Sequence, residues 1–250
     1  MNKILNQLSV GKKNLAVLID PDKNQDDSQL LQLLKKIASL QPAFIFVGGS
    51  TVEASNFNNC IELIKKNCKI PLVIFPGSQE QIHPDADGIL FLSLISGRNP
   101  DYLIGHHVET AHRLKKMNVE VIPTGYLLID GGRNSSVQYV SQTTPIPADQ
   151  ISIAVKTAIA GELLGMKAIF LDAGSGAYNS ISSKMIEEVR RNIKIPLIIG
   201  GGLKTIEQVK IAFESGADVV VIGNKIEDDV DFLLDLMELE NTERKLKSTN

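Results

Sequence analysis

The chain has 250 residues, close to the roughly 250 of a single (β/α)₈ barrel, and it is 43% hydrophobic and 22% charged. This composition excludes a disordered chain, and a formal net charge of −3 gives no electrostatic reason to expect nucleic acid as a partner. The amino-terminal segment lacks a signal-peptide pattern, and no run approaches the roughly 18 apolar residues that span a bilayer. We therefore expect a single cytoplasmic domain over residues 1–250, with Cys60 and Cys68 as reduced, inert thiols.

After a first short helix, apolar β-branched runs alternate with helical patterns along the chain. Predicted strands lie at 15–20, 43–47, 72–75, 88–93, 121–129, 168–172, 197–199 and 219–222. Predicted helices lie at 26–40, 52–67, 100–117, 149–165, 180–192, 205–215 and 226–239. This alternation, with strands that are apolar throughout, favours a parallel sheet buried on both faces. We predict a (β/α)₈ TIM barrel, and a doubly wound open sheet is the alternative that periodicity leaves open.

Two connections depart from the regular pattern. The segment between residues 75 and 88 contains Pro76 and Pro84 and has little room for a helix of normal length. We expect the third outer helix to be missing or replaced by a loop, which would open an apolar flank of the barrel. A short irregular connection that still packs well is an equal alternative. The connection 130–150 is long, as functional or mobile loops are.

Glycine-rich strand ends in the last third of the chain predict a phosphate site. They read FLDAGSG at 170–176, IIGGGLKT at 198–205 and VVVIGN at 219–224. Glycine lets the backbone approach a ligand closely, and the N–H groups at a following helix start point toward an anion. In a (β/α)₈ barrel the loops after the late strands are the usual phosphate site.

Two early strand ends carry oxygen ligands. Asp20 closes an apolar run in LIDPDK, and Ser50 and Thr51 follow Gly48-Gly49 after the next strand. A carboxylate at the active face of a barrel, beside a hydroxyl, suits Mg²⁺, which prefers oxygen ligands and often bridges to phosphates. Helix capping is the alternative role for these side chains.

The motifs LIDPDK, FVGGST, TGYLLID, FLDAGSGA, IIGGGLKT and VIGN, in this order, resemble the geranylgeranylglyceryl phosphate synthase family, which is related to the bacterial heptaprenylglyceryl phosphate synthases. The resemblance runs from about residue 18 to residue 224 and implies a Mg²⁺-dependent prenyltransferase on a TIM barrel without a regular third outer helix. Such an enzyme forms an ether between the 3-hydroxyl of sn-glycerol 1-phosphate and C1 of a polyprenyl diphosphate, here geranylgeranyl diphosphate, and releases diphosphate in lipid biosynthesis. The resemblance also implies a homo-oligomer, either a dimer or a hexamer. Because the product of such a reaction is a lipid phosphate, we further expect peripheral contact with a membrane surface.

The resemblance also assigns residues, with Asp20 and Ser50 as Mg²⁺ ligands. The implied substrate-binding residues are Phe170, Leu171, Asp172, Ala173, Gly174, Ser175, Gly176, Gly201, Gly202, Gly223 and Asn224. Asp172 is the candidate that takes the hydroxyl proton or stabilises positive charge, or else only clamps a hydroxyl. Tyr126 is a candidate to line the cationic carbon, or else fills the barrel mouth. The family usually has tyrosine and glutamate where this chain has Phe170 and Asp172.

Two other functions remain open from the residues alone. One is another phosphate-binding TIM-barrel enzyme, a phosphosugar isomerase or lyase, and the other is a catalytically degenerate barrel that binds phosphometabolites. His106, His107 and His112 lack the i, i+4 spacing of paired metal ligands, so we predict packing or surface roles for them.

Overall fold

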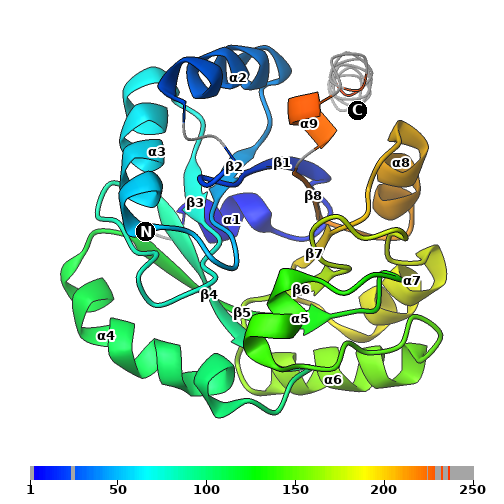
Figure 1. Cartoon of the computed structure of the whole chain (residues 1–250). Coiled ribbons are helices and arrows are strands. Elements are labelled where there is room, and N and C mark those ends of the chain that lie inside the picture. Colours follow the sequence, from blue (N-terminus) through cyan, green and yellow to red (C-terminus); the bar gives the residue numbers. More distant parts are fainter. Residues whose placement is uncertain (1–2, 24–25, 224, 229–231, 233–235, 237–250) are drawn as a thin grey trace.

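The computed structural model describes residues 3–23, 26–223, 225–228, 232 and 236. Its parallel strands close into one barrel, seen along the barrel axis in Figure 1, because each strand pairs with the next and β8 pairs with β1. This closure confirms the predicted barrel and excludes an open sheet. The strands are β1 (Asn14–Ile19), β2 (Phe44–Val47), β3 (Leu72–Ile74), β4 (Gly88–Leu94), β5 (Glu120–Leu128), β6 (Ala168–Asp172), β7 (Leu197–Gly200) and β8 (Val219–Ile222).

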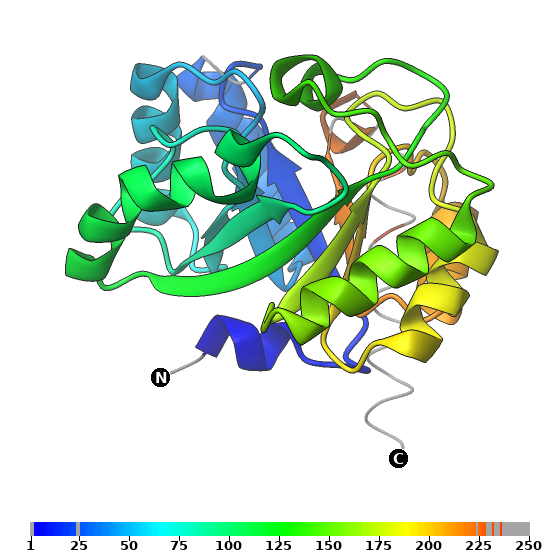
Figure 2. The same cartoon turned by 90° about the horizontal axis from the view of Figure 1, so that it is seen from below.

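Helices surround the barrel, and one short helix lies at each of its two ends. Figure 2 shows α1 below the barrel and α5 at the opposite end, above the carboxyl ends of the strands. The predicted helix at 226–239 begins as α9, and most of its remainder lies outside the described residues. The helical elements are α1 (Lys3–Leu8), α2 (Asp27–Leu40), α3 (Ala54–Asn67), the π-helical turn η1 (Asp101–Gly105), α4 (His106–Lys116), α5 (Ser136–Ser141), α6 (Ile151–Leu163), α7 (Ser183–Asn192), α8 (Ile206–Glu214) and α9 (Lys225–Asp228).

The core has two layers, because successive side chains of a strand point to opposite faces. Phe44, Phe46 and Phe170 belong to the layer inside the barrel, which α1 closes from below with Ile4 and Leu8. The other layer lies between the strands and the surrounding helices. The inside is therefore filled by side chains, and a ligand is expected at the end of the barrel or on an open flank.

The connection between β3 and β4 has no helix over residues 75–87, all of which the structure describes. Figure 1 shows only a loop at this place, between α3 and α4. The prediction of a missing third outer helix is confirmed. Ile82 and Ala86 pack from this loop into the outer layer of the core.

The long connection after β5 contains the unpredicted helix α5. It is only six residues long, too short for a hydrophobic period to be recognised. Its ends are well defined, because the Ser135 hydroxyl accepts a hydrogen bond from the Gln138 N–H at 3.3 Å and Gln142 adopts a left-handed conformation. The loop is thus ordered above the end of the barrel where the strands finish.

Across the part of the chain that the structure describes, no helix combines the length and the apolar character needed to cross a membrane. Cys60 and Cys68 are free thiols, and burial raises the pKa of Cys60 to about 12. The Cys60 thiol therefore stays protonated and unreactive near neutral pH, as predicted.

Candidate active site

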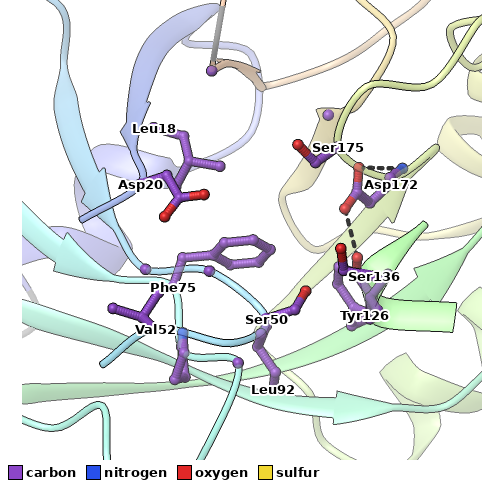
Figure 3. A pocket seen from close by; sticks show the side chains of 18 of the residues that line it. Leu18, Asp20, Ser50, Val52, Phe75, Leu92, Tyr126, Ser136, Asp172 and Ser175 are labelled. Carbon is purple, nitrogen blue, oxygen red and sulfur yellow. Dashed lines mark hydrogen bonds between the residues drawn. The ribbon is translucent and has the colours of Figure 1, made fainter. Parts of the chain in front are cut away.

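A pocket of about 670 Å³ lies at the carboxyl ends of the strands. In Figure 3, Asp20, Phe75 and Val52 come from the early strand ends on one side, while Asp172, Ser175 and Tyr126 come from the later strands on the other. The pocket continues from the late glycine loops to the flank between β4 and α4. One cavity therefore joins a glycine-lined region to an apolar one.

The glycine-lined end depends on backbone that only glycine adopts readily. Gly174, Gly176, Gly201 and Gly202 all line the pocket and have φ values between +68° and +88°. A Cβ atom added to Gly201 would lie 2.5 Å from Asp172 Oδ1 and 2.7 Å from the Gly174 nitrogen. The loops after β6 and β7 therefore meet through bare backbone, which leaves backbone groups to line this end of the pocket.

Asp172 and Tyr126 form a buried hydrogen-bonded pair beside these glycines. The Tyr126 hydroxyl donates to Asp172 Oδ2 at 2.5 Å, and the Gly174 N–H donates to Asp172 Oδ1 at 2.8 Å (Figure 3). Burial raises the pKa of Asp172, while these two hydrogen bonds oppose the rise. Burial and the neighbouring carboxylate raise the pKa of Tyr126 well above its usual value, so the phenol keeps its proton.

Phe170 packs into an aromatic cluster at the base of the pocket. Its ring centroid lies 5.2 Å from that of Phe75 and 5.6 Å from that of Tyr126. A Cβ atom at Gly200 would lie 2.8 Å from the Phe170 ring, so a glycine is needed behind the ring. The Phe170 side chain is 1% exposed and has no polar atom. Tyr126 therefore provides the hydroxyl of this cluster.

The early strand ends place Asp20 and Ser50 in the same pocket. A Cβ atom at Gly49 would lie 3.2 Å from Asp20 Oδ1, so the absence of a side chain lets this loop approach the carboxylate. Burial is the main cause that raises the pKa of Asp20, and its Oδ1 accepts the Asp22 N–H at 3.2 Å. The Asp22 carboxylate accepts a hydrogen bond from the Asn56 side-chain amide at 2.9 Å, which connects the loop after β1 to α3.

Among the described residues, no three His, Cys, Asp or Glu side chains gather as a ready-made metal site. Mg²⁺ commonly binds one or two protein carboxylates and completes its coordination with water and substrate phosphates. The Asp20 carboxylate and the Ser50 hydroxyl, both facing the pocket, fit a site of this kind.

The other end of the pocket is apolar and lies along the flank that lacks a helix. Ile82, Ile89 and Phe91 line it from the crossover and β4, and η1 and α4 close it with Tyr102, His106, His107 and Thr110. The His107 ring meets Phe91 edge-on at a centroid distance of 4.2 Å, and the His106 ring meets Tyr102 in the same way at 4.8 Å. The predicted packing role fits these contacts, but the sequence did not place either histidine in the pocket.

Most predicted site residues converge on the pocket. Leu171 and Ala173 differ, because their side chains belong to the outer layer of the core, on the strand face opposite to Phe170 and Asp172. Only their backbone groups can face a ligand. Asn224 lies outside the described residues. The predicted residues that line the pocket are Asp20, Ser50, Tyr126, Phe170, Asp172, Gly174, Ser175, Gly176, Gly201, Gly202 and Gly223.

Comparison with known proteins shows similarity over nearly the whole chain. Residues 9–241 match the PcrB family. A geranylgeranylglyceryl phosphate synthase from Chitinophaga pinensis is 45% identical over 94% of this chain and 93% of its own length. The synthase of the same name from Korarchaeum cryptofilum is 39% identical over 90% of this chain and 92% of its own. A crystal structure of (S)-3-O-geranylgeranylglyceryl phosphate synthase from Thermoplasma acidophilum, in complex with its substrate sn-glycerol-1-phosphate, superimposes with a TM-score of 0.88 at 30% identity and covers 95% of this chain and 98% of that one.

Proposed function

The chain belongs to the PcrB family, and we propose that it transfers the prenyl group of a polyprenyl diphosphate to the 3-hydroxyl of sn-glycerol 1-phosphate. The observation that carries the proposal is the single pocket that joins a glycine-lined cradle to an apolar flank. A phosphosugar isomerase or lyase would need the cradle but has no use for the apolar flank. The relatives named geranylgeranylglyceryl phosphate synthase support a geranylgeranyl donor.

Glycerol 1-phosphate is assigned to the glycine-lined end. Its phosphate would lie against the backbone of Gly174, Ser175 and Gly176 and of Gly201 and Gly202. This assignment is supported by the related Thermoplasma acidophilum enzyme, whose structure contains that substrate. With the phosphate there, the glycerol hydroxyls extend toward Asp172, which lies between the two glycine loops.

The reaction forms one C–O bond and breaks another. The 3-hydroxyl oxygen of glycerol phosphate bonds to C1 of the prenyl group, and diphosphate leaves with the electron pair of the broken C–O bond. Asp172 would hold the hydroxyl and take its proton, and this role is supported by the hydrogen bonds from Tyr126 and from the Gly174 N–H that fix its carboxylate. Tyr126 keeps its proton and acts by orienting Asp172 and stabilising its negative charge.

Diphosphate is assigned to the early strand ends, where Asp20 and Ser50 would hold Mg²⁺. Bound there, the ion would neutralise diphosphate charge and make diphosphate a better leaving group. Gly49 and Gly77 line this part of the pocket, so the diphosphate would lie against their backbone beside Asp20.

The prenyl tail is assigned to the flank between β4 and α4. A closed barrel has no space for a long tail, because its inside is filled by Phe44, Phe46 and their neighbours. Ile82, Ile89 and Phe91 offer apolar surface, and burying each CH₂ is worth about 0.8 kcal/mol. The missing helix thus creates the site that the substrate needs.

Incubation with radiolabelled sn-glycerol 1-phosphate, Mg²⁺ and prenyl diphosphates of several lengths tests the proposal. We expect a labelled ether lipid that resists alkaline hydrolysis, and no product when sn-glycerol 3-phosphate replaces the labelled substrate. A protein that binds glycerol 1-phosphate but yields no ether with any prenyl diphosphate would contradict the proposal and favour a degenerate phosphate-binding barrel.

The oligomeric state of the protein and its location in the cell remain predictions. Tyr139 in α5 is 86% exposed, and Leu163 and Leu164 at the end of α6 are 82% and 74% exposed. Large apolar and aromatic side chains of this kind are enriched at protein interfaces and support a homo-oligomer. As part of the proposed function, the protein is located in the cytoplasm and binds reversibly to a membrane surface, which receives the lipid product.

A further inference from the structure

Gln81 is a buried polar side chain in the loop that replaces the third outer helix. Its side chain is 1% exposed, and its amide makes three hydrogen bonds to backbone. The Gln81 Nε2 group donates to the Gly49 carbonyl at 2.8 Å, while Oε1 accepts from the Gly77 N–H at 3.1 Å and from the Gly49 N–H at 3.4 Å. Buried amides are costly unless they are paired, so this geometry specifies one position for the loop.

The bonded glycines belong to two different strand ends. Gly49 follows β2 and Gly77 follows β3, and a Cβ atom on Gly77 would collide with the Gly49 carbonyl oxygen. A Cβ atom on Gly48 would likewise collide with the Phe75 carbonyl oxygen. The two loops therefore touch through their backbones, and the hydrogen bonds of the Gln81 amide connect Gly49 of one loop to Gly77 of the other.

Gln81 is absent from the described residues that line the pocket, whereas the groups that it holds line it. Gly49 lies between Ser50 and the Asp20 carboxylate, and Gly77 lies opposite Gly49. The next residue, Ile82, lines the apolar end of the same pocket. One short segment thus connects the region assigned to diphosphate with the region assigned to the prenyl tail.

We propose that Gln81 is a positioning residue that sets the diphosphate half of the active site through the backbone of Gly49 and Gly77. The inference rests on the proposed prenyl transfer and deepens it. It predicts a defect in the use of one substrate only, because the glycerol phosphate cradle is built from the loops after β6 and β7, whereas the hydrogen bonds of the Gln81 amide go to the loops after β2 and β3. Loss of the amide should impair use of the prenyl diphosphate and spare glycerol 1-phosphate.

Gln81→Leu removes the amide and keeps a side chain of similar size. We expect kcat/KM for the prenyl diphosphate to fall about tenfold or more, since a misplacement of about 1 Å can cost roughly a hundredfold in rate. The dissociation constant of sn-glycerol 1-phosphate, measured by calorimetry, should change less than about twofold, which also shows that the barrel is folded. Gln7→Leu is the matched control, because Gln7 Nε2 donates at 3.0 Å to the Ala43 carbonyl at the opposite end of β2. That variant should keep the native kinetics.

Gln81→Glu distinguishes positioning from general destabilisation. A protonated carboxyl can donate to the Gly49 carbonyl and accept from the two N–H groups, whereas a carboxylate can only accept. Activity of this variant relative to the native enzyme should therefore recover as the pH is lowered. The inference is overturned if Gln81→Leu retains native kcat/KM for the prenyl diphosphate, if it weakens both substrates equally, or if Gln81→Glu shows no recovery at low pH. A native protein without transferase activity would overturn the proposed function itself, and this inference with it.

Discussion

Replacing Tyr126 with phenylalanine removes one hydroxyl and leaves the ring that packs against Phe75 and Phe170. The buried Asp172 carboxylate then loses its 2.5 Å hydrogen bond and keeps the bond from the Gly174 N–H. A hydrogen bond to a charged group contributes about 1.5–3 kcal/mol, and 1.36 kcal/mol corresponds to a factor of ten in an equilibrium. The ionised form of Asp172 therefore becomes between about 10- and 150-fold less favoured than in the native enzyme.

The effect of Tyr126→Phe on kcat/KM depends on pH, and the raised pKa of Asp172 determines the pH range in which the variant is slower. Because burial raises that pKa, the reactive carboxylate is lost as the pH falls through a value above that of an ordinary aspartate. Tyr126→Phe raises the pKa further, so the acid limb of kcat/KM moves to higher pH. On that limb the variant should be about 10- to 150-fold slower than the native enzyme at the same pH. At alkaline pH, where both enzymes carry the carboxylate, the difference should narrow.

The assay is kcat/KM for sn-glycerol 1-phosphate across the pH range, with saturating prenyl diphosphate. Tyr139→Phe is the matched control, because Tyr139 is 86% exposed and is absent from the described residues that line the pocket. If the ratio of kcat/KM between Tyr126→Phe and the native enzyme is the same reduced value at every pH, Tyr126 fixes the geometry of Asp172 without stabilising its carboxylate form. A ratio near one throughout would refute the proposed role of the pair.

Other predictions concern the remaining parts of the site. Asp20→Asn should lower Mg²⁺-dependent turnover by roughly a hundredfold or more without changing the thermal melting curve, and a near-native rate would remove Asp20 from the metal site. Ser175→Glu should weaken glycerol 1-phosphate binding about tenfold or more in calorimetry through charge repulsion, and unchanged affinity would place the phosphate elsewhere. Ile82→Phe should shorten the longest accepted prenyl diphosphate and spare glycerol 1-phosphate affinity, so an unchanged chain-length profile would move the tail away from this flank. Light scattering should give a multiple of the 27.3 kDa chain mass, which Tyr139→Lys should reduce if α5 lies in the interface, whereas a native monomer would exclude assembly.

Much of the barrel follows from local sequence. The bounds of β6 and β8 match the prediction, because each is a short apolar run that is buried on both faces. The missing outer helix follows from Pro76 and Pro84 in a short connection. Strand alternation also separates Phe170 and Asp172 from Leu171, so the outward direction of Leu171 was accessible from the sequence once β6 was recognised.

The remaining site features depend on contacts between distant segments. The Tyr126–Asp172 pair requires the register that aligns Tyr126 with Phe170, and no local pattern encodes that register. His107 enters the pocket because α4 lies beside the open flank. The three hydrogen bonds of Gln81 depend on how the ends of β2 and β3 meet, and a lone glutamine in a loop gives no signal of them.

The central claim is that one continuous pocket holds both substrates, with the phosphate at the late glycine loops and the prenyl tail along the flank without a helix. A crystal structure with sn-glycerol 1-phosphate and a non-hydrolysable geranylgeranyl diphosphate analogue tests it most directly. We predict phosphate density against Gly174–Gly176 and Gly201–Gly202, and tail density between β4 and α4 beside Ile82 and Phe91. A tail that leaves the barrel mouth toward α5, or a phosphate bound away from these glycines, would contradict the account.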